Sequence, residues 1–566
     1  NDVVIVFNGE IYNFKELRKD LIENGESFKS NTDTEVILRL YTLYGKSMLT
    51  KLNGIFSIAI WDKKNDSLFI ARDSFGIKPL YYIENSNGFF FSSEIKSLIK
   101  FLEDDDLKID FESLDRYLSF LWCPGNGTAF NKIKKINPGE FFIVKQGSIE
   151  QRSFWYKLPS YKDKSKDKLP DLINDTRFFL RQAVHRQMIS DAPVGAFLSG
   201  GLDSSSVVAF AKEVDPGISC FTINSQDGTE KGTIDDLPYA RKTAKFLNVP
   251  LEVISINSKN MSDDLETMIY QLDEPLADPA ALNVLYISEI AKKNNIKVLL
   301  SGTGGDDIFT GYRRHEAINS QKYFDKIPSK IRKIIEESSY KLNTNVPLFR
   351  KAAKLLSGFS LAGDERLVNY FKWSHRDDLF SLYSDNFKEQ LNDSIPESVL
   401  LDFLEENASD LDDLSKMLLL EQRFFLTDHN LNYTDKMSMA AGVEVRVPFL
   451  DLDLVNFGSS IPNNYKQRGR TGKWILKKAM EPYLPKDIIY RPKTGFGAPV
   501  RKWIQFELND LVNDTLSKER IKKRGLFDPD AIANIIKMNK EGKRDFSYTI
   551  LSLLCIEIWC SKFKDS

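Results

Sequence analysis

Hydrophobic and polar positions follow two different patterns along this chain. Up to about residue 155, short runs rich in β-branched and aromatic residues predict β-strands. These runs cover residues 3–7, 54–61, 67–71, 80–83, 88–92 and 140–145. Helices are expected at Phe14–Glu23, with Asn13 as the N-cap, and from Asp33 to about Tyr44. This part of the chain is therefore predicted to be a β-rich domain.

From residue 170 to residue 315 the pattern changes to short apolar strands that alternate with helices. The strands are expected at 194–198, 218–223, 251–256 and 298–300, and the helices near 172–188, 203–213, 237–247, 262–272 and 282–293. Such alternation indicates a parallel, doubly wound sheet, whose ligands bind at the carboxyl ends of its strands. Beyond residue 320 the chain is expected to be mainly helical. The charge-dense stretch 157–168 predicts a linker or a solvated loop.

The stretch Leu198-Ser199-Gly200-Gly201-Leu202-Asp203-Ser204-Ser205 follows one of these strands and opens a helix. A strand, a glycine turn and a helix N-terminus together form an anion site, because free backbone N–H groups and the helix dipole face the ligand. The Asp203 carboxylate would repel a phosphate, and a Mg²⁺ ion between the two groups removes this conflict. A glycine turn with serine and aspartate caps is the alternative interpretation.

A second loop, Ser301-Gly302-Thr303-Gly304-Gly305-Asp306-Asp307, follows the strand at 298–300 and has the same order of features. The carboxyl ends of parallel strands meet at one edge of a sheet. Asp203 and Asp306 are therefore expected to face a single Mg²⁺–pyrophosphate unit. A glycine-rich turn with aspartate caps is again the alternative.

Two further motifs are candidate functional sites, but their sequence patterns are less specific. In Thr471-Gly472-Lys473-Trp474, the lysine ammonium at a helix start would neutralise charge that develops on a phosphate. Taken alone, this stretch is better interpreted as a solvated basic helix face, and the basic loop at 491–497 is equally ambiguous. Asn8-Gly9 is either a turn or an elbow that binds an oxyanion.

Composition argues against several classes of protein. The net charge of −2 argues against a nucleic-acid-binding surface. No apolar run reaches the roughly 18–20 residues that a membrane span needs. The four cysteines and four histidines are scattered, which argues against a metal cluster or a Ser/His triad and indicates a reduced, cytoplasmic location. No Walker-type phosphate loop is present.

Together these motifs resemble the glutamine-dependent (glutamine-hydrolysing) asparagine synthetase family over nearly the whole chain. Ser199–Ser205 is similar to the pyrophosphate loop of the ATP-pyrophosphatase fold. The stretches similar to the glutaminase domain of the family are Asn8–Asn13, Asp33–Ile37, Ala71–Tyr82 and Phe91–Glu94, and Gly442–Asp451 is similar to a signature of its synthetase domain.

The resemblance implies a two-domain architecture. Residues 1–155 would form an α+β N-terminal nucleophile (Ntn) glutamine amidotransferase domain with αββα layers, incomplete at its N-terminus. Residues 156–170 would form a linker. Residues 171–566 would form an α/β ATP-pyrophosphatase (PP-loop) synthetase domain with a helical C-terminal part.

The resemblance also implies a reaction: ATP-dependent amidation of L-aspartate through β-aspartyl-AMP, with release of AMP, pyrophosphate and glutamate. In the full-length enzyme, glutamine hydrolysis would supply the ammonia. Asn8 and Gly9 would form the oxyanion hole and bind glutamine with Glu10 and Asp33. Lys473 would stabilise the adenylation transition state, and Asp203 and Asp306 would hold Mg²⁺. The residues implied for ATP are Phe197, Ser199, Gly200, Gly201, Asp203, Ser204, Ser205, Ile223, Ser301 and Gly302. The implied partners are small molecules, with no nucleic acid and no membrane, and a homodimer is a possible assembly.

Three departures from the family pattern bear on function. Residue 1 is Asn1 rather than the family's nucleophilic cysteine, so the sequence is expected to be truncated and to use ammonia in place of glutamine. Thr303 stands where many members have glutamate, and residues 272–281 differ from the segment that contacts aspartate. The acid therefore stays open, and the alternative is a uronic acid of a surface-polysaccharide precursor.

Two hypotheses from other classes fit the sequence less well. A tRNA-thiolating ATP-pyrophosphatase would need a basic face and a reactive cysteine pair. A non-catalytic scaffold would carry a broken phosphate loop, whereas Asp203, Asp306 and Lys473 are all present.

Overall fold

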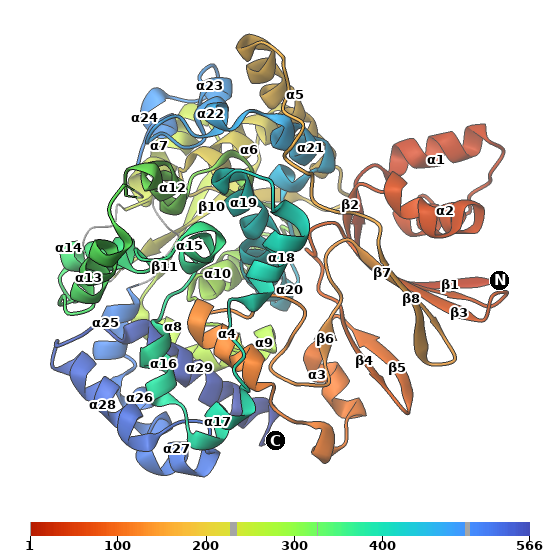
Figure 1. Cartoon of the computed structure of the whole chain (residues 1–566). Helices are drawn as coiled ribbons and strands as arrows, with labels where there is room; N and C mark the ends of the chain where they lie inside the picture. The colour runs from red at the N-terminus through yellow and green to blue at the C-terminus, as the bar shows by residue number, and fades with distance from the viewer. Residues whose placement is uncertain (1, 227–234, 325, 493–498, 566) are drawn as a thin grey trace.

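The computed structural model describes residues 2–226, 235–324, 326–492 and 499–565. The chain begins in an antiparallel five-stranded sheet with the order β1-β2-β3-β7-β8, beside a three-stranded sheet with the order β5-β4-β6 (Figure 1). The strands are β1 (Val3–Ile11), β2 (Gly54–Asp62), β3 (Ser67–Arg72), β4 (Tyr81–Asn85), β5 (Gly88–Ser92), β6 (Lys134–Lys135), β7 (Glu140–Lys145) and β8 (Ser148–Phe154).

These two sheets stack between helices. Helices α1 (Phe14–Glu23) and α2 (Asp33–Tyr44) cover the larger sheet, where Leu40 and Ile58 share one apolar core. The opposite side of this sheet packs on the smaller one, with Phe142 against Tyr82. Helices α3 (Ile95–Leu98) and α4 (Phe111–Phe120) pack on the smaller sheet in turn. The layers are therefore helices, larger sheet, smaller sheet and helices. Asn13 makes no side-chain cap on α1; its side chain accepts a hydrogen bond from Asn53 N instead.

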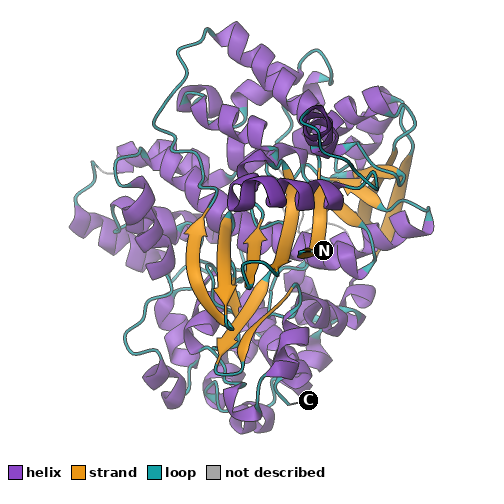
Figure 2. Cartoon of the chain, turned by 90° about the vertical axis from the view of Figure 1, so that its right-hand side faces the viewer, coloured by secondary structure: helices purple, strands orange, loops and turns teal. Residues whose placement is uncertain are grey.

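The next sheet is parallel throughout, as predicted, with the order β11-β10-β9-β12-β13. Four of its strands confirm predicted ones: β9 (Val194–Phe197), β10 (Ser219–Ser225), β11 (Leu251–Ile256) and β12 (Val298–Leu300). The fifth, β13 (Glu444–Arg446), was not predicted; it comes from a distant part of the chain and pairs with β12. Figure 2 looks onto the first part of the chain, whose antiparallel strands lie at the centre of the view with helices around them.

Helices make up most of the remaining chain, as expected. Those around the parallel sheet are α5 (Leu169–Gln187), α6 (Leu202–Val214), α7 (Leu237–Leu247), α8 (Ser258–Asp263), α9 (Leu265–Leu272), α10 (Ala280–Lys293) and α11 (Gly305–Phe309). Next come α12 (Arg313–Phe324), α13 (Ser329–Ser339), α14 (Pro347–Leu356), α15 (Gly363–Asn369), α16 (Arg376–Leu382), α17 (Asp385–Gln390), α18 (Ser398–Ala408), α19 (Asp413–Leu420) and α20 (Asn432–Ala440). The last are α21 (Leu452–Ser460), α22 (Asn463–Lys466), α23 (Trp474–Met480), α24 (Lys486–Ile489), α25 (Val500–Gln505), α26 (Asn509–Thr515), α27 (Lys518–Arg524), α28 (Pro529–Lys540) and α29 (Ser547–Phe563).

Residues Glu421–Leu431 join α19 to α20 as a π-helical segment. Wide helical turns of this kind occur frequently at functional sites. Within the described ranges, none of the helices combines the length and the apolar character that crossing a bilayer requires.

The stretch 157–168 joins β8 to α5 and most of its residues are exposed, but it is also anchored at a few points. Tyr161 is buried, and its hydroxyl accepts a hydrogen bond from Gln422 Nε2 at 2.5 Å. Ser165 N donates to Ser460 O at 2.8 Å. One buried aromatic ring and these hydrogen bonds hold an otherwise polar segment against the second domain.

Candidate active site

The two glycine loops leave neighbouring parallel strands at the same edge of the sheet. β9 and β12 pair directly, with Ala196 opposite Leu300, and each loop begins within two residues of its strand. The loop backbones touch: a Cβ atom on Gly302 would lie 2.6 Å from Ser204 N. Only glycine allows this approach, so the second loop packs directly on the start of α6.

The first loop is held in shape by its own serines and by an arginine. Ser199 N donates to Ser204 Oγ at 3.2 Å, and Gly201 N donates to Ser199 Oγ at 3.3 Å. Gly200 has φ +69°, a left-handed conformation that glycine adopts without strain. Arg491 donates to Gly200 O at 3.0 Å and pairs with Asp236. The loop that precedes α6 therefore has a fixed conformation at the positive end of the helix dipole.

Lys473 lies between the two loop carboxylates. Its Nζ is 2.6 Å from Asp306 Oδ1 and also forms an ion pair with Asp203. Burial disfavours the ammonium, but the two carboxylates outweigh burial and raise the pKa of Lys473. Lys473 N donates to Thr310 Oγ1 at 3.0 Å, which fixes the start of α23. The solvated helix face that the stretch suggested when taken alone is wrong, because Lys473 is buried.

A cavity of about 870 Å³ opens over these loops. It is lined by most of the residues proposed for ATP and metal, namely Phe197, Ser199, Gly201, Asp203, Ser204, Ser301, Gly302, Asp306 and Lys473. Three residues predicted for ATP do not line it. Gly200 packs against the backbone of Tyr239, Ser205 is fully buried in α6, and Ile223 packs into an apolar cluster beside β10.

The cavity also has lining residues that the sequence did not single out. They are mainly aromatic or polar and include Trp122, Asp278, Tyr312, Phe425, His429 and Tyr433. No local motif marks them, because they come from segments far apart in the chain. The one detectable signal was the unusual stretch 272–281, which holds Asp278. Arg491 of the ambiguous basic loop contacts the phosphate loop, whereas residues 493–498 of that loop lie outside the described part of the chain.

The residues predicted to bind glutamine gather at the end of β1. Asn8 and Gly9 lie within this strand, so the turn interpretation of Asn8-Gly9 is wrong. A Cβ atom on Gly9 would lie 2.0 Å from Ile55 O, which requires glycine here. Asn8 Nδ2 donates to Ser93 Oγ at 3.2 Å, and Asp33 Oδ2 accepts from Ile11 N at 3.1 Å.

The carboxyl groups of this cluster have shifted acidities. Burial raises the pKa of Glu10 to about 7, with Arg446 acting in the opposite direction. Burial also raises the pKa of Asp33, partly offset by its hydrogen bond from Ile11 N. Arg446 belongs to β13, and its Nη2 lies 3.5 Å from Glu10 Oε2. A residue of the parallel sheet therefore partly offsets the effect of burial on a carboxyl group in the first domain.

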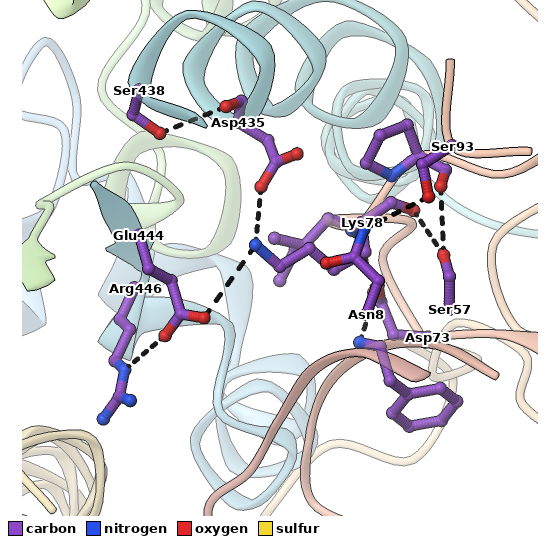
Figure 3. A network of polar contacts seen from close by, with 12 residues as sticks. Asn8, Ser57, Asp73, Lys78, Ser93, Asp435, Ser438, Glu444 and Arg446 are labelled. Carbon is purple, nitrogen blue, oxygen red and sulfur yellow. Dashed lines mark hydrogen bonds and ion pairs between the residues drawn. The ribbon is translucent and has the colours of Figure 1, made fainter. Parts of the chain in front are cut away.

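Figure 3 shows the polar network that joins the domains. Lys78 Nζ lies 2.8 Å from Asp435 Oδ1 and 4.0 Å from Glu444 Oε2, and Glu444 Oε1 accepts from Arg446 Nε at 2.8 Å. The carbonyl of Arg446 accepts from Ser301 N at 2.8 Å. The chain of contacts therefore runs from the first domain, through β13, to the second glycine loop.

Comparison with known proteins identifies both parts. Residues 1–155 match the glutamine amidotransferase domain family, and residues 175–561 match the asparagine synthase family. Glutamine-hydrolyzing asparagine synthetase 1 of Bacillus subtilis is 32% identical over 560 residues, which cover 98% of this chain and 85% of that protein. A putative glutamine-hydrolyzing asparagine synthetase of Mycobacterium tuberculosis is 29% identical, covering 99% of this chain and 84% of that protein. Amidase chry2 of Gibberella zeae is 24% identical, covering 92% and 81%.

An amidotransferase domain joined to a sheet with paired glycine loops defines a two-domain, amide-forming ligase. The chain belongs to the asparagine synthase family, of the glutamine-dependent type.

Proposed function

We propose that this enzyme uses ATP to amidate a carboxylic acid, with ammonia taken from glutamine. The observation that carries the proposal is the convergence of Asp203, Asp306 and Lys473 at the mouth of two glycine loops. A carboxylate is a poor acyl donor. Attack of its oxygen on the α-phosphate of ATP gives an acyl-adenylate and releases pyrophosphate, and ammonia then attacks the acyl carbon and displaces AMP to form the amide.

The pyrophosphate would lie against the first loop, where the N–H groups at the start of α6 converge. Lys473 would stabilise the charge that grows on the leaving pyrophosphate, because its ammonium is buried and already fixed between two carboxylates. Phe197, Ser301 and Gly302 line the same cavity and would contact the adenosine.

The carboxylates also fit a Mg²⁺ ion. Among the described residues there is no group of three or more His, Cys, Asp or Glu side chains suited to a metal. Mg²⁺ bound with a nucleotide needs only one or two carboxylates, because phosphate oxygens and waters complete its shell. Asp203 and Asp306 already converge on one cationic centre, the Lys473 ammonium. They would hold the ion, which would neutralise pyrophosphate charge.

The first domain would supply ammonia. Asn8 and Gly9 would stabilise the oxyanion of glutamine hydrolysis, and Glu10 and Asp33 would bind the glutamine α-ammonium group. The support is the gathering of these four residues at the end of β1, with Asp33 hydrogen-bonded to Ile11 N.

Two acids are candidates. The names of the relatives point to L-aspartate, which would pass through β-aspartyl-AMP to L-asparagine. The second is a uronic acid, and Thr303 favours it. Its neutral hydroxyl lies 2.8 Å from Ser301 Oγ, where the family's glutamate would bring a charge.

The test supplies ATP, Mg²⁺, ammonium chloride and one acid at a time, and measures AMP, pyrophosphate and amide. We expect the three products in equal amounts with one class of acid, and their loss in Asp203→Asn. Formation of ADP and phosphate, or amide formation that Asp203→Asn leaves intact, would contradict the proposal.

A further inference from the structure

One wall of the cavity is a continuous aromatic surface. Its rings are those of Trp122, Tyr312, Phe425, His429 and Tyr433. The ring centroids are 6.0 Å apart for Trp122–Phe425, 5.7 Å for Tyr312–Phe425, 5.0 Å for Phe425–His429 and 5.2 Å for His429–Tyr433. We call these five residues the aromatic wall.

The aromatic wall is built from both domains. Trp122 follows α4 of the first domain, Tyr312 follows α11, and Phe425 and His429 belong to the π-helical segment. Three separate segments therefore converge to make one surface. The aromatic wall is not simply one face of a single helix.

This wall touches the second glycine loop. Tyr312 OH lies 3.4 Å from both carboxylate oxygens of Asp307, the residue after Asp306. The neighbouring Thr303 and Ser301 hydroxyls are 2.8 Å apart and line the same cavity. The aromatic wall thus stands beside the place where the acid must meet the α-phosphate of ATP.

Polar groups on the wall are suited to hydroxyl groups. His429 Nε2 lies 3.1 Å from Asp278 Oδ2, which leaves Nδ1 as an acceptor when Nε2 carries the proton. This Nδ1 is buried without a hydrogen-bond partner within the described ranges. An acceptor nitrogen, a carboxylate and the Thr303 hydroxyl can together pair with several ligand hydroxyl groups.

Three of the cationic groups around the cavity form ion pairs with acidic residues. Lys473 pairs with Asp306, Arg470 with Glu316 and Arg491 with Asp236. Behind the wall, the Arg314 guanidinium lies 4.3 Å from the Tyr312 ring centroid and 4.6 Å from that of Phe425. Glu421 pairs with this arginine and neutralises it.

The two candidate acids differ in the partners that they need in the cavity. Aspartate carries an α-carboxylate and an α-ammonium besides the reacting carboxylate, and each needs a charged partner once it leaves water. Among the described lining residues, Lys477 and the exposed Arg313 could pair with the α-carboxylate and Asp278 with the α-ammonium, so the charges by themselves admit either acid. A uronic acid carries no charge besides its reacting carboxylate, and the C–H face of its ring packs against aromatic faces.

We propose that the acid amidated by this enzyme is a sugar acid of the hexuronate class, whose ring lies on the aromatic wall and whose hydroxyls pair with Asp278 and His429. This inference rests on the proposed function and names its substrate. The C6 carboxylate oxygen would attack the α-phosphate of ATP and release pyrophosphate. Ammonia would then add to the acyl carbon, displace AMP and lose a proton, which leaves the uronamide.

The experiment measures pyrophosphate release and amide formation with ATP, Mg²⁺ and ammonium chloride. The acids are glucuronate, galacturonate, their UDP conjugates and L-aspartate, each in a separate reaction. We expect turnover with at least one sugar acid, at a kcat/KM about tenfold or more above that with aspartate. The free and UDP-linked arms show whether the sugar acid is used alone or on a nucleotide carrier.

Two variants test the assignment of residues. Asp278→Asn should lower kcat/KM for the sugar acid about tenfold or more, with the KM for ATP within about twofold of wild type. Arg313→Gln should leave sugar-acid turnover within about twofold, whereas an enzyme that uses Arg313 to bind aspartate would lose about tenfold or more.

The outcomes separate the two claims. Turnover with aspartate alone would overturn the sugar-acid assignment and leave the proposed function standing. Absence of pyrophosphate release with every acid would overturn both. An unchanged sugar-acid KM in a folded Asp278→Asn variant would overturn the placement of the ring.

Discussion

Lys78 of the first domain and Asp435 of the second form a buried ion pair, with 2.8 Å between Nζ and Oδ1. Their side chains are 1% and 6% exposed, so solvent does not screen the pair. Burial alone would lower the pKa of Lys78, but Asp435 and Glu444 outweigh burial and raise it. The two domains are therefore joined by a buried ion pair in which each charged group stabilises the charge of the other.

Removing one member of this pair should destabilise the protein. In Lys78→Met the Asp435 carboxylate stays buried without its partner, which costs about 3–5 kcal/mol. Urea denaturation followed by tryptophan fluorescence would measure this loss. Lys242→Ala, which removes an exposed ion pair with Asp487, is the control and should change stability far less. Equal midpoints for Lys78→Met and wild type would contradict the assignment.

Glu10 should make stability depend on pH. Its folded pKa of about 7 is above its ordinary value of 4.5, so the folded state binds a proton more tightly than the unfolded state. The stabilisation is complete below pH 4.5 and is lost as the pH rises through 7. Melting temperatures of wild type and Glu10→Gln between pH 5 and 8 would check this. We expect wild type to lose stability relative to the variant as the pH rises. Parallel curves of melting temperature against pH would rule out the raised pKa of Glu10.

Lys473 should act in the chemical step. Lys473→Met should lower kcat for pyrophosphate release by a factor of about 10² to 10³, because the growing charge loses its fixed cation. The KM for ATP should change much less. Lys478→Met is the matched control, since Lys478 lies five residues further along the chain, in α23, and pairs with Glu481. A Lys473→Met variant with near-wild-type kcat would remove this residue from the mechanism.

Gly302 should tolerate no side chain. An alanine Cβ would meet Ser204 N at 2.6 Å, so the two loops would have to separate. We expect Gly302→Ala to lower activity about 100-fold and to destabilise the fold by about 1–3 kcal/mol. Gly217→Ala is the control, because its Cβ would meet only Asp215 Oδ1 at 3.6 Å. If Gly302→Ala keeps full activity, the close approach of the loops has no functional importance.

Local signals in the sequence predicted both phosphate-type loops and four of the five strands of the parallel sheet. The strand before Ser199, the two glycines and the start of the following helix all lie within a dozen residues. Lys473 was ambiguous because its burial depends on Asp203 and Asp306, which lie far away in the chain. β13 was missed because a three-residue strand has no pattern of its own and is defined only by pairing with β12.

The aromatic wall was missed for the same reason. Trp122, Tyr312 and Phe425 are separated widely in sequence, and each alone is typical of a hydrophobic core. The stretch 272–281 gave a partial signal, because its departure from the family pattern lies where Asp278 meets His429.

The central claim is that the paired loops and Lys473 activate a carboxylate by adenylation. The most direct measurement uses an acid labelled with ¹⁸O in the reacting carboxylate, with ATP and ammonium chloride, and mass spectrometry of the phosphorus products. The account predicts one ¹⁸O atom in the phosphate of AMP for each amide formed. Label in inorganic phosphate formed with ADP, or amide formed with unlabelled AMP, would contradict it.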